Sequence, residues 1–391
     1  MKQENCGSLF QAITDVPADA IFGINDQFLK DPRPNKINLT VGIFIEEDGK
    51  SAQILPSVHL AEEKILQFSD TKNYLPIDGD LDYVELTKKL VFGEGNLFNI
   101  YGAQTIGGTS ALRIIADFIR KEISNTISIP NPTWENHKNV FTKAGLVIDE
   151  YPYPESMYEH ICKLPSGTVV LLHAMCHNPT GIDLTKSEWE KLEIVFRERK
   201  LIPFFDTAYQ GFGIGIEEDA WPIRYFLEKG HEFFVAHSYS KSFSLYGERV
   251  GALFVVIKDK VLLDRVRRNI RSLIRTAYSN PPRHGAAIVK HVLHTQNLRL
   301  MWELEMTKAR NRMQNLRNLF SLKLKEKIPE KVFPYLDEGH GFFALLALSQ
   351  VQTDKLRDEF AIYTAGRSRV NLTALNSKNI DYIVNSIAKV V

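Results

Sequence analysis

The sequence predicts an α/β protein: a large domain with a mostly parallel sheet flanked by helices, and a smaller α/β domain built from both chain ends. Unbroken apolar runs at 168–173, 201–206 and 233–237 have strand length and are typical of strands buried on both faces. Amphipathic helical patterns such as 186–200 separate these runs. The 391 residues are 44% hydrophobic, which is enough for one large core and a second, smaller one.

The elements alternate along the chain. An N-terminal arm over 1–15 either clasps a partner subunit or is a frayed terminus, and a short helix near 17–22 and a strand at 36–39 follow it. Helices are expected at 57–68, 81–92, 111–121 and 135–144, and strands at 126–129 and 146–150. After the three buried strands come an apolar strand at 250–257 and helices at 261–275 and 298–327, the last long enough to bridge two domains. Segments 341–348, 354–360 and 369–372 and a terminal helix from 377 complete a small α/β unit. We therefore expect a small domain from 16–44 and 309–391, and a large domain over 45–308.

Composition favours an enzyme that acts on small molecules. The chain has 48 basic and 47 acidic side chains, a formal net charge of +1, and no basic tract that would bind nucleic acid or an anionic membrane. It shows no signal core and no apolar run long enough to span a bilayer, so we expect a cytoplasmic protein. Cys6, Cys162 and Cys176 are odd in number and lack metal-ligand spacing, so we expect free thiols and no metal site.

Lys241 is the centre of the predicted chemistry. It lies in Ser238-Tyr239-Ser240-Lys241, between the apolar runs 232–236 and 250–257. On a turn at the end of a buried sheet, desolvation and the nearby cation Arg249 both disfavour the ammonium form and free a nucleophilic amine. Such an amine suits a Schiff base with an aldehyde. The plain alternative is a solvated surface lysine.

Two other buried strands also end in distinctive residues. His173 leads into Asn178-Pro179-Thr180-Gly181, and Asp206 closes the next strand, three residues before Tyr209. In open α/β sheets the working residues cluster at the carboxyl edge. Burial of Asp206 requires a cationic partner such as a protonated pyridine nitrogen, unless the residue is a helix N-cap. The turn Gly107-Gly108-Thr109 offers amides and a hydroxyl to a phosphate, or merely starts a helix.

In combination and in this order, these motifs resemble the class I pyridoxal-phosphate aminotransferases, and within them the aspartate and aromatic aminotransferases. Segments over nearly the whole chain share the family pattern, namely 71–79, 131–137, 178–181, 206–212, 238–249, 278–282 and 368–371. The resemblance implies the family's fold and an aspartate aminotransferase (aspartate:2-oxoglutarate transaminase) of amino acid metabolism. Such an enzyme moves the amino group between aspartate or glutamate and 2-oxoglutarate or oxaloacetate by a ping-pong mechanism. Aromatic amino acids stay open as further substrates.

The resemblance also implies the catalytic residues. Pyridoxal 5'-phosphate would be bound covalently to Lys241, which then moves a proton between the substrate α-carbon and the cofactor. Asp206 would pair with the pyridine nitrogen and keep it protonated, so that the ring withdraws electrons, and His137 would orient Asp206 from behind. Tyr209 and Asn178 would bond the phenolic oxygen of the cofactor.

The remaining contacts follow from the same resemblance. Trp134 would stack on the cofactor ring, and the phosphate would be held by Gly108, Thr109, Ser238 and Arg249, with Tyr74 from the other subunit. Arg369 would fork onto the substrate α-carboxylate, with Gly42, Trp134 and Asn178 beside it. Arg275, from the other subunit, would receive the distal carboxylate. These assignments imply a homodimer with shared active sites.

Departures and alternatives accompany this assignment. The segment 151–167 is shorter than in the family, Ile106 stands where proline is common, and Arg367 lies two residues from Arg369 and could compete for the carboxylate. Trp134 and His137 also suit plain core positions, and Arg275 suits a cationic helix C-terminus. Two other functions stay open, a pyridoxal-phosphate lyase or decarboxylase and a cofactor-holding binding protein. Arg275 and Arg369 argue against the first, because together they would bind two carboxylates. Lys241, Asp206 and Tyr209 argue against the second.

Overall fold

The fold is described from a computed structural model of the chain. It describes residues 8, 10, 12–14, 20–51, 53–68, 71–95 and 97–391. Most of the predicted arm at 1–15, including Cys6, and the start of the predicted helix at 17–19 lie outside these residues. The helix that follows, α1 (Ala20–Lys30), extends beyond the predicted end at residue 22.

A seven-stranded sheet forms the middle of the large unit, in the order β2-β8-β7-β6-β5-β3-β4. Its strands are β2 (Ile100–Ile106), β3 (Thr126–Asn131), β4 (Val147–Pro152), β5 (Val169–His173), β6 (Ile202–Thr207), β7 (Phe233–Ser238) and β8 (Val250–Val256). Strands β3 to β7 pair in parallel, whereas β8 runs antiparallel to both β7 and β2. The predicted fold class is therefore confirmed, including the mostly parallel sheet.

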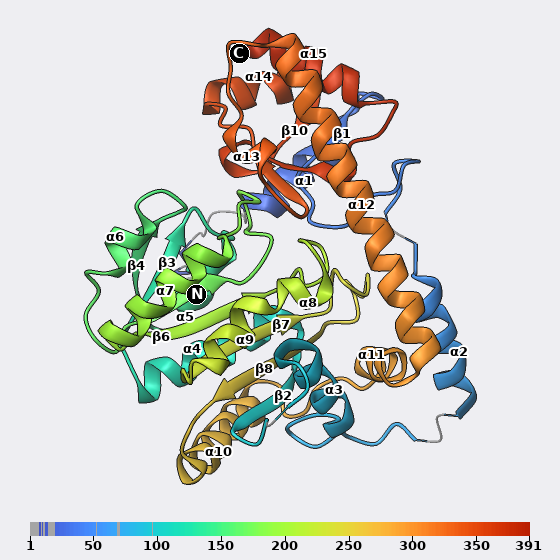
Figure 1. Cartoon of the computed structure of the whole chain (residues 1–391). Coiled ribbons are helices and arrows are strands. Elements are labelled where there is room, and N and C mark those ends of the chain that lie inside the picture. The colour runs from blue at the N-terminus through green and yellow to red at the C-terminus, as the bar shows by residue number, and fades with distance from the viewer. Residues whose placement is uncertain are drawn as a thin grey trace, which may run out of the picture.

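Helices cover both faces of this sheet (Figure 1). Consecutive strand residues point to opposite sides, so that Leu171 and Phe204 belong to one core cluster and Leu172 and Phe205 to the other. This is why the strands read as continuous apolar runs. One face carries α4 (Gly107–Glu122), α5 (Asn136–Lys143) and α10 (Lys260–Ala277). The other carries α3 (Leu81–Phe92), α7 (Lys186–Arg199), α9 (Trp221–Glu228) and α11 (His284–His294).

A third core cluster lies in a smaller unit at the top of Figure 1. There β1 (Ile37–Asn38) pairs in parallel with β10 (Ile362–Tyr363), and β9 (Phe343–Leu345) pairs antiparallel with β11 (Arg369–Asn371). The helices of this unit are α1, α13 (Pro334–Asp337), α14 (Gln350–Phe360) and α15 (Ile380–Val390). The long helix α12 (Gln296–Lys327) joins the two units, because its Trp302 packs in a large-unit cluster and its Phe320 in the third.

Some elements differ from the prediction. Strand β2 was not predicted, because Gly102, Gln104 and Thr105 interrupt its apolar pattern. Gly102 is required there, since a Cβ at this position would lie 2.7 Å from the Phe254 ring. Helices α9 and α11 were also not predicted, and α4 begins at Gly107, earlier than the predicted residue 111. Helix α2 (Pro56–Phe68) and the short helices α6 (Met157–Ile161) and α8 (Ile216–Asp219) complete the large unit.

Candidate active site

A cavity of about 220 Å³ opens at the carboxyl edge of the parallel strands. The register places His173 beside Asp206 and Asp206 beside Ala236, so the ends of β5, β6 and β7 meet there. Nine predicted site residues line this cavity: Gly108, Thr109, Trp134, Asn178, Asp206, Tyr209, Ser238, Lys241 and Arg249. Tertiary structure thus brings together residues that lie on five separate stretches of the sequence.

Lys241 lies half-buried on the turn that follows β7. Its Nζ stands 5.4 Å from the centre of the Tyr209 ring. Burial, together with the positive charges of Arg249 and Arg369, lowers the pKa of Lys241 to about 8 against the opposing effect of Asp206. About a tenth of the side chain is therefore a neutral amine at pH 7, far more than for an unshifted lysine, in the direction that the sequence predicted.

Asp206 heads a buried chain of hydrogen bonds. His137 Nε2 lies 3.0 Å from Asp206 Oδ2, and Thr133 Oγ1 lies 2.8 Å from His137 Nδ1 and 3.0 Å from His173 Nε2. Burial alone would raise the pKa of Asp206, but the hydrogen bond from His137 and the neighbouring charges outweigh it and lower the pKa. Burial lowers the pKa of His173 to about 3, so this imidazole stays neutral. Asp206 is held as an anion that faces the cavity.

The start of α4 and Arg249 form a cradle for an anion. Ile106 provides no side-chain cap, so the first-turn amides of this 16-residue helix face the cavity with the positive end of its dipole. Gly107 and Gly108 are needed for close approach, because a Cβ would lie 2.5 Å from Arg249 Nη2 and 3.0 Å from Ser238 Cβ, respectively. Arg249 Nη1 donates to Ser240 Oγ at 3.2 Å, which orients the guanidinium.

Arg369 reaches the same region from the small unit. It is 5% exposed, and it donates to Asn178 Oδ1 at 3.2 Å and to the Thr40 carbonyl at 2.7 Å. Its guanidinium carbon stands 4.2 Å from the centre of the Phe343 ring, and its buried Nε has no hydrogen-bond partner. Gly42 is adjacent, since a Cβ there would lie 3.2 Å from the same ring. A guanidinium with an unused buried donor is suited to a carboxylate.

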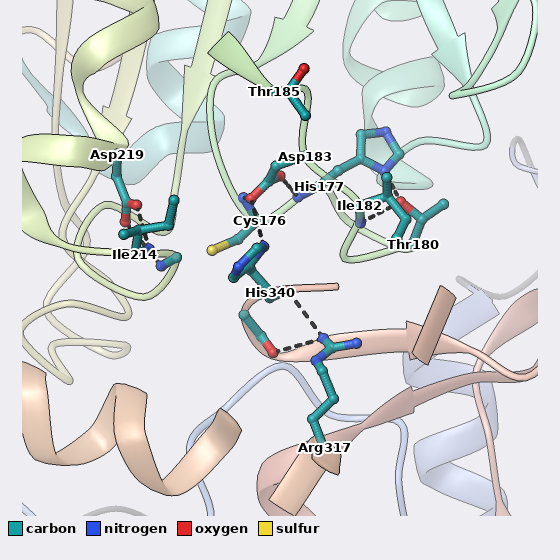
Figure 2. Close-up of polar contacts among 12 residues, drawn as sticks. Cys176, His177, Thr180, Ile182, Asp183, Thr185, Ile214, Asp219, Arg317 and His340 are labelled. Atoms are coloured by element: carbon teal, nitrogen blue, oxygen red, sulfur yellow. Dashed lines mark hydrogen bonds and ion pairs between the residues drawn. The ribbon is translucent and has the colours of Figure 1, made fainter. Parts of the chain in front are cut away.

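The loop that carries Asn178 is fixed from both units. Figure 2 shows the Asp183 carboxylate accepting from the backbone amides of Cys176, at 2.8 Å, and His177, at 3.0 Å. The His340 amide donates to the Gly181 carbonyl at 2.7 Å, and Arg317 donates to the carbonyls of His340 and Phe343 on the same turn. Asn178 therefore lies on a braced loop at the junction of the two units.

Gly42, His137 and Arg369 adjoin the cavity without lining it, whereas Tyr74, Arg275 and Arg367 are exposed outside it. The side chains of Tyr74 and Arg275 are exposed, Tyr74 to 91%. Arg275 Nη1 contacts Ser279 Oγ on its own chain. Arg367 donates to Asn131 Oδ1 at 3.0 Å and lines a second hollow of about 170 Å³ together with Arg369 and Asn178. Arg367 does not share the buried position of Arg369.

Several lining residues were not predicted. Met175, Ser240 and Tyr246 line the cavity, and Thr133 joins the two histidines behind Asp206. The Tyr246 hydroxyl accepts a hydrogen bond from the Phe44 amide at 2.9 Å, and burial raises its pKa to about 12. Ser240 and Tyr246 lie within the Lys241 motif, so their position in the sequence was a usable signal.

Together, the hydrogen-bonding and charged groups of this cavity suit one kind of ligand. The α4 amides and Arg249 suit a phosphate, Asp206 suits a protonated ring nitrogen, and the neutral amine of Lys241 suits an aldehyde. The glycines at 107 and 108 let Arg249 and Ser238 approach the start of α4 closely. This set has the chemistry of a site for pyridoxal phosphate.

Comparison with known proteins defines the class. The family Aminotransferase class I and II matches residues 34–387, and this chain belongs to it. The aspartate aminotransferase of Salmonella typhi is 42% identical over 98% of this chain and 100% of the relative. The aromatic-amino-acid aminotransferase of Escherichia coli K12 is 36% identical over 98% of this chain and 100% of the relative.

Solved structures of aminotransferases have the same fold as this chain. The aromatic-amino-acid aminotransferase of Burkholderia pseudomallei, described as covalently bound to pyridoxal phosphate, has a TM-score of 0.93 and 41% identity, covering 98% of this chain and 100% of that one. The cytoplasmic aspartate aminotransferase of Saccharomyces cerevisiae has a TM-score of 0.94 and 30% identity, covering 98% of each chain. The predicted family is confirmed, and the chain is an aminotransferase of the class that uses pyridoxal phosphate.

Within the described residues, no helix has both the length and the apolarity that crossing a bilayer requires.

Proposed function

We propose that this aminotransferase transfers the amino group between aspartate or glutamate and 2-oxoglutarate or oxaloacetate, with aromatic amino acids as a second substrate class. The curated relatives named above include both aspartate and aromatic-amino-acid aminotransferases. The observation that carries the proposal is the convergence of Lys241, Asp206 and Arg249 on one cavity that Arg369 approaches through Asn178.

The proposed cofactor contacts follow from the hydrogen-bonding and charged groups of the cavity. Gly108, Thr109, Ser238 and Arg249 would hold the phosphate, and Trp134 would lie against the ring. Asp206 would pair with the ring nitrogen, and Tyr209 and Asn178 would bond the phenolic oxygen. When bound, pyridoxal phosphate supplies a protonated ring that withdraws the electron pair left on the substrate α-carbon.

The protein's own groups bind the substrate and move its proton. Arg369 receives the α-carboxylate with two N–H groups along one edge of its guanidinium, beside Gly42 and Asn178. The amine of Lys241 would bind the cofactor covalently and, once the substrate has released it, would move the proton from the substrate α-carbon to the cofactor. Its lowered pKa leaves a free amine for both tasks near neutral pH. His137 keeps Asp206 ionised through the 3.0 Å hydrogen bond.

The working unit is a homodimer with shared active sites. Tyr74 and Arg275 are exposed on their own chain, so neither serves the cavity that Lys241 lines. In a dimer, Tyr74 would complete the phosphate site of the other subunit and Arg275 would receive the distal carboxylate. Large apolar side chains are exposed on α2, at Leu66 and Phe68, and on the adjacent first half of α12, at Leu300 and Leu304, as expected of an interface.

The domain division and the location are part of the proposal. The arm at 1–15 precedes a small domain of 16–44 and 309–391, and 45–308 form the large domain. The separate third core cluster, which contains Leu39 and residues from 316 to 390, supports this division. We place the protein in the cytoplasm, which agrees with its balanced charge and its unpaired Cys162 and Cys176.

One spectroscopic experiment tests the reaction. The cofactor-loaded protein is mixed with aspartate or glutamate, and the absorbance of the cofactor is followed. Conversion to the amine form, reversed by a 2-oxo acid, is the expected result. Release of CO₂ or ammonia would instead indicate a decarboxylase or a lyase, and an unchanged spectrum would indicate a binding protein.

A further inference from the structure

Tyr74 and Arg275 are far apart in the sequence but belong to one anchored region of the chain. Tyr74 lies in the segment 71–80, which has no regular secondary structure, and Arg275 lies in the last turn of α10. Both side chains are exposed, whereas Asp78, four residues after Tyr74, is only 3% exposed. Asp78 does not line the cavity.

The Asp78 carboxylate joins the segment to α10. Its Oδ2 accepts from Arg271 Nη1 at 2.5 Å, and its Oδ1 accepts from Tyr101 Oη at 2.7 Å. Arg267 Nη2 lies 3.6 Å from the same Oδ2. Arg271 stands one helical turn before Arg275, on the same face of α10. A single buried carboxylate therefore fixes the segment of Tyr74 and the helix end of Arg275 to the edge strand β2.

A second buried side chain, Gln104 on β2, repeats this connection. Its Nε2 donates to the Pro282 carbonyl at 2.6 Å, and its Oε1 accepts from the Asp80 amide at 3.1 Å. Asn280 Nδ2 donates to the Leu75 carbonyl at 2.7 Å. These hydrogen bonds hold the segment of Tyr74 against the turn that follows α10.

We propose that Asp78 is a positioning residue for the active site of the other subunit, holding Tyr74 and Arg275 in register for the phosphate and for the distal carboxylate. This inference rests on the proposed homodimer with shared sites. Asp78 acts in trans: it affects the cavity to which its own chain contributes Tyr74 and Arg275, and not the cavity that contains its own Lys241.

The first test is the Asp78→Ala homodimer. Misplacing the two residues should lower kcat/KM for aspartate about 10- to 100-fold, mainly through KM, with a much smaller loss for phenylalanine. The dissociation constant of pyridoxal phosphate from the apoprotein should rise as well, because Tyr74 no longer meets the phosphate. Arg268→Ala, at an exposed position on the same helix, is the matched control and should change neither value. An Asp78→Ala enzyme with normal values overturns the inference.

The decisive test uses hybrid dimers, with separately tagged subunits co-expressed and purified. In a hybrid of Asp78→Ala and Lys241→Ala subunits, one site combines an intact Lys241 with Tyr74 and Arg275 from the subunit whose Asp78 is intact. That site should regain wild-type kcat/KM. Each intact-lysine site in a hybrid of His137→Ala and Lys241→Ala subunits should be no more active than a site of the His137→Ala homodimer. The reason is that the His137 defect lies in the same site as the intact lysine.

The outcomes separate this inference from the proposed dimer. If Arg275→Ala complements Lys241→Ala but Asp78→Ala does not, Asp78 acts within its own site and the inference is wrong while the shared site stands. If neither complements and the active protein has the mass of one chain, both fail. Asp78→Asn and Arg271→Ala serve if Asp78→Ala does not fold, and each should complement Lys241→Ala in the same way.

Discussion

The cavity at the strand ends and the exposed region around Tyr74 and Arg275 differ in how completely one chain builds them. Around Asp206 and Lys241, the groups are buried, hydrogen-bonded and shifted in pKa by their neighbours. Tyr74 and Arg275 are exposed, although the backbone beneath them is anchored by Asp78. One chain thus brings together the groups proposed to move protons, whereas in the proposed dimer a second copy would select the far end of the substrate.

Replacing Lys241 should have the largest effect. Lys241→Ala should retain pyridoxal phosphate through the phosphate contacts yet lose at least about 10⁴-fold in kcat, because covalent attachment and proton transfer disappear together. Steady-state kinetics and cofactor content of the purified variant measure this. Lys258→Ala, at an exposed position, is the control and should be unaffected. Near-normal activity of Lys241→Ala would show that the reaction does not depend on this lysine.

Replacing Asp206 should have the next largest effect. Asp206→Ala should lower kcat by about 10³-fold, since an unpaired ring nitrogen loses its proton and withdraws electrons poorly. Asp206→Glu keeps the charge and should retain more activity than the alanine variant. If both variants behave alike at every pH, the charge of Asp206 is not what matters.

Arg275 tests the exposed region directly. Removing one side of a desolvated ion pair costs about 3–5 kcal/mol, so Arg275→Ala should lower kcat/KM for aspartate and glutamate by roughly 10²- to 10³·⁵-fold. Phenylalanine, whose ring needs no cationic partner, should be affected far less. The measurement is kcat/KM for aspartate and for phenylalanine in the wild type and in Arg275→Ala. Equal losses would mean that Arg275 is structural, and the dicarboxylate assignment would be withdrawn.

The pH dependence of cofactor attachment should give the smallest effect and sharpen the description of the cavity. Burial lowers the pKa of Lys241 to about 8, so the reactive neutral amine is lost as the pH falls through this value. The rate of pyridoxal phosphate attachment to the apoprotein should rise with pH up to about 8 and then level off. A rate that still climbs about tenfold per unit above pH 9 would show an unshifted lysine.

The sequence by itself predicted the residues proposed for the chemistry, because each motif is contiguous and its meaning is local. Lys241 with Ser238 and Arg249, and Asp206 with Tyr209, are each readable within a few residues along the chain. Continuous apolarity likewise predicted the parallel strands that end at these motifs, since burial on both faces leaves no polar alternation.

Only the tertiary structure decided which distant groups meet. Arg369 bonds to Asn178 across 191 positions, and no local pattern encodes that contact. Strand β2 was missed because Gly102 and Gln104 serve its neighbours, the first by making room for Phe254 and the second by binding Pro282 and Asp80. The link from Asp78 to Arg271 has the same origin: a buried carboxylate must find its cation wherever packing brings one, and packing is a property of the whole fold.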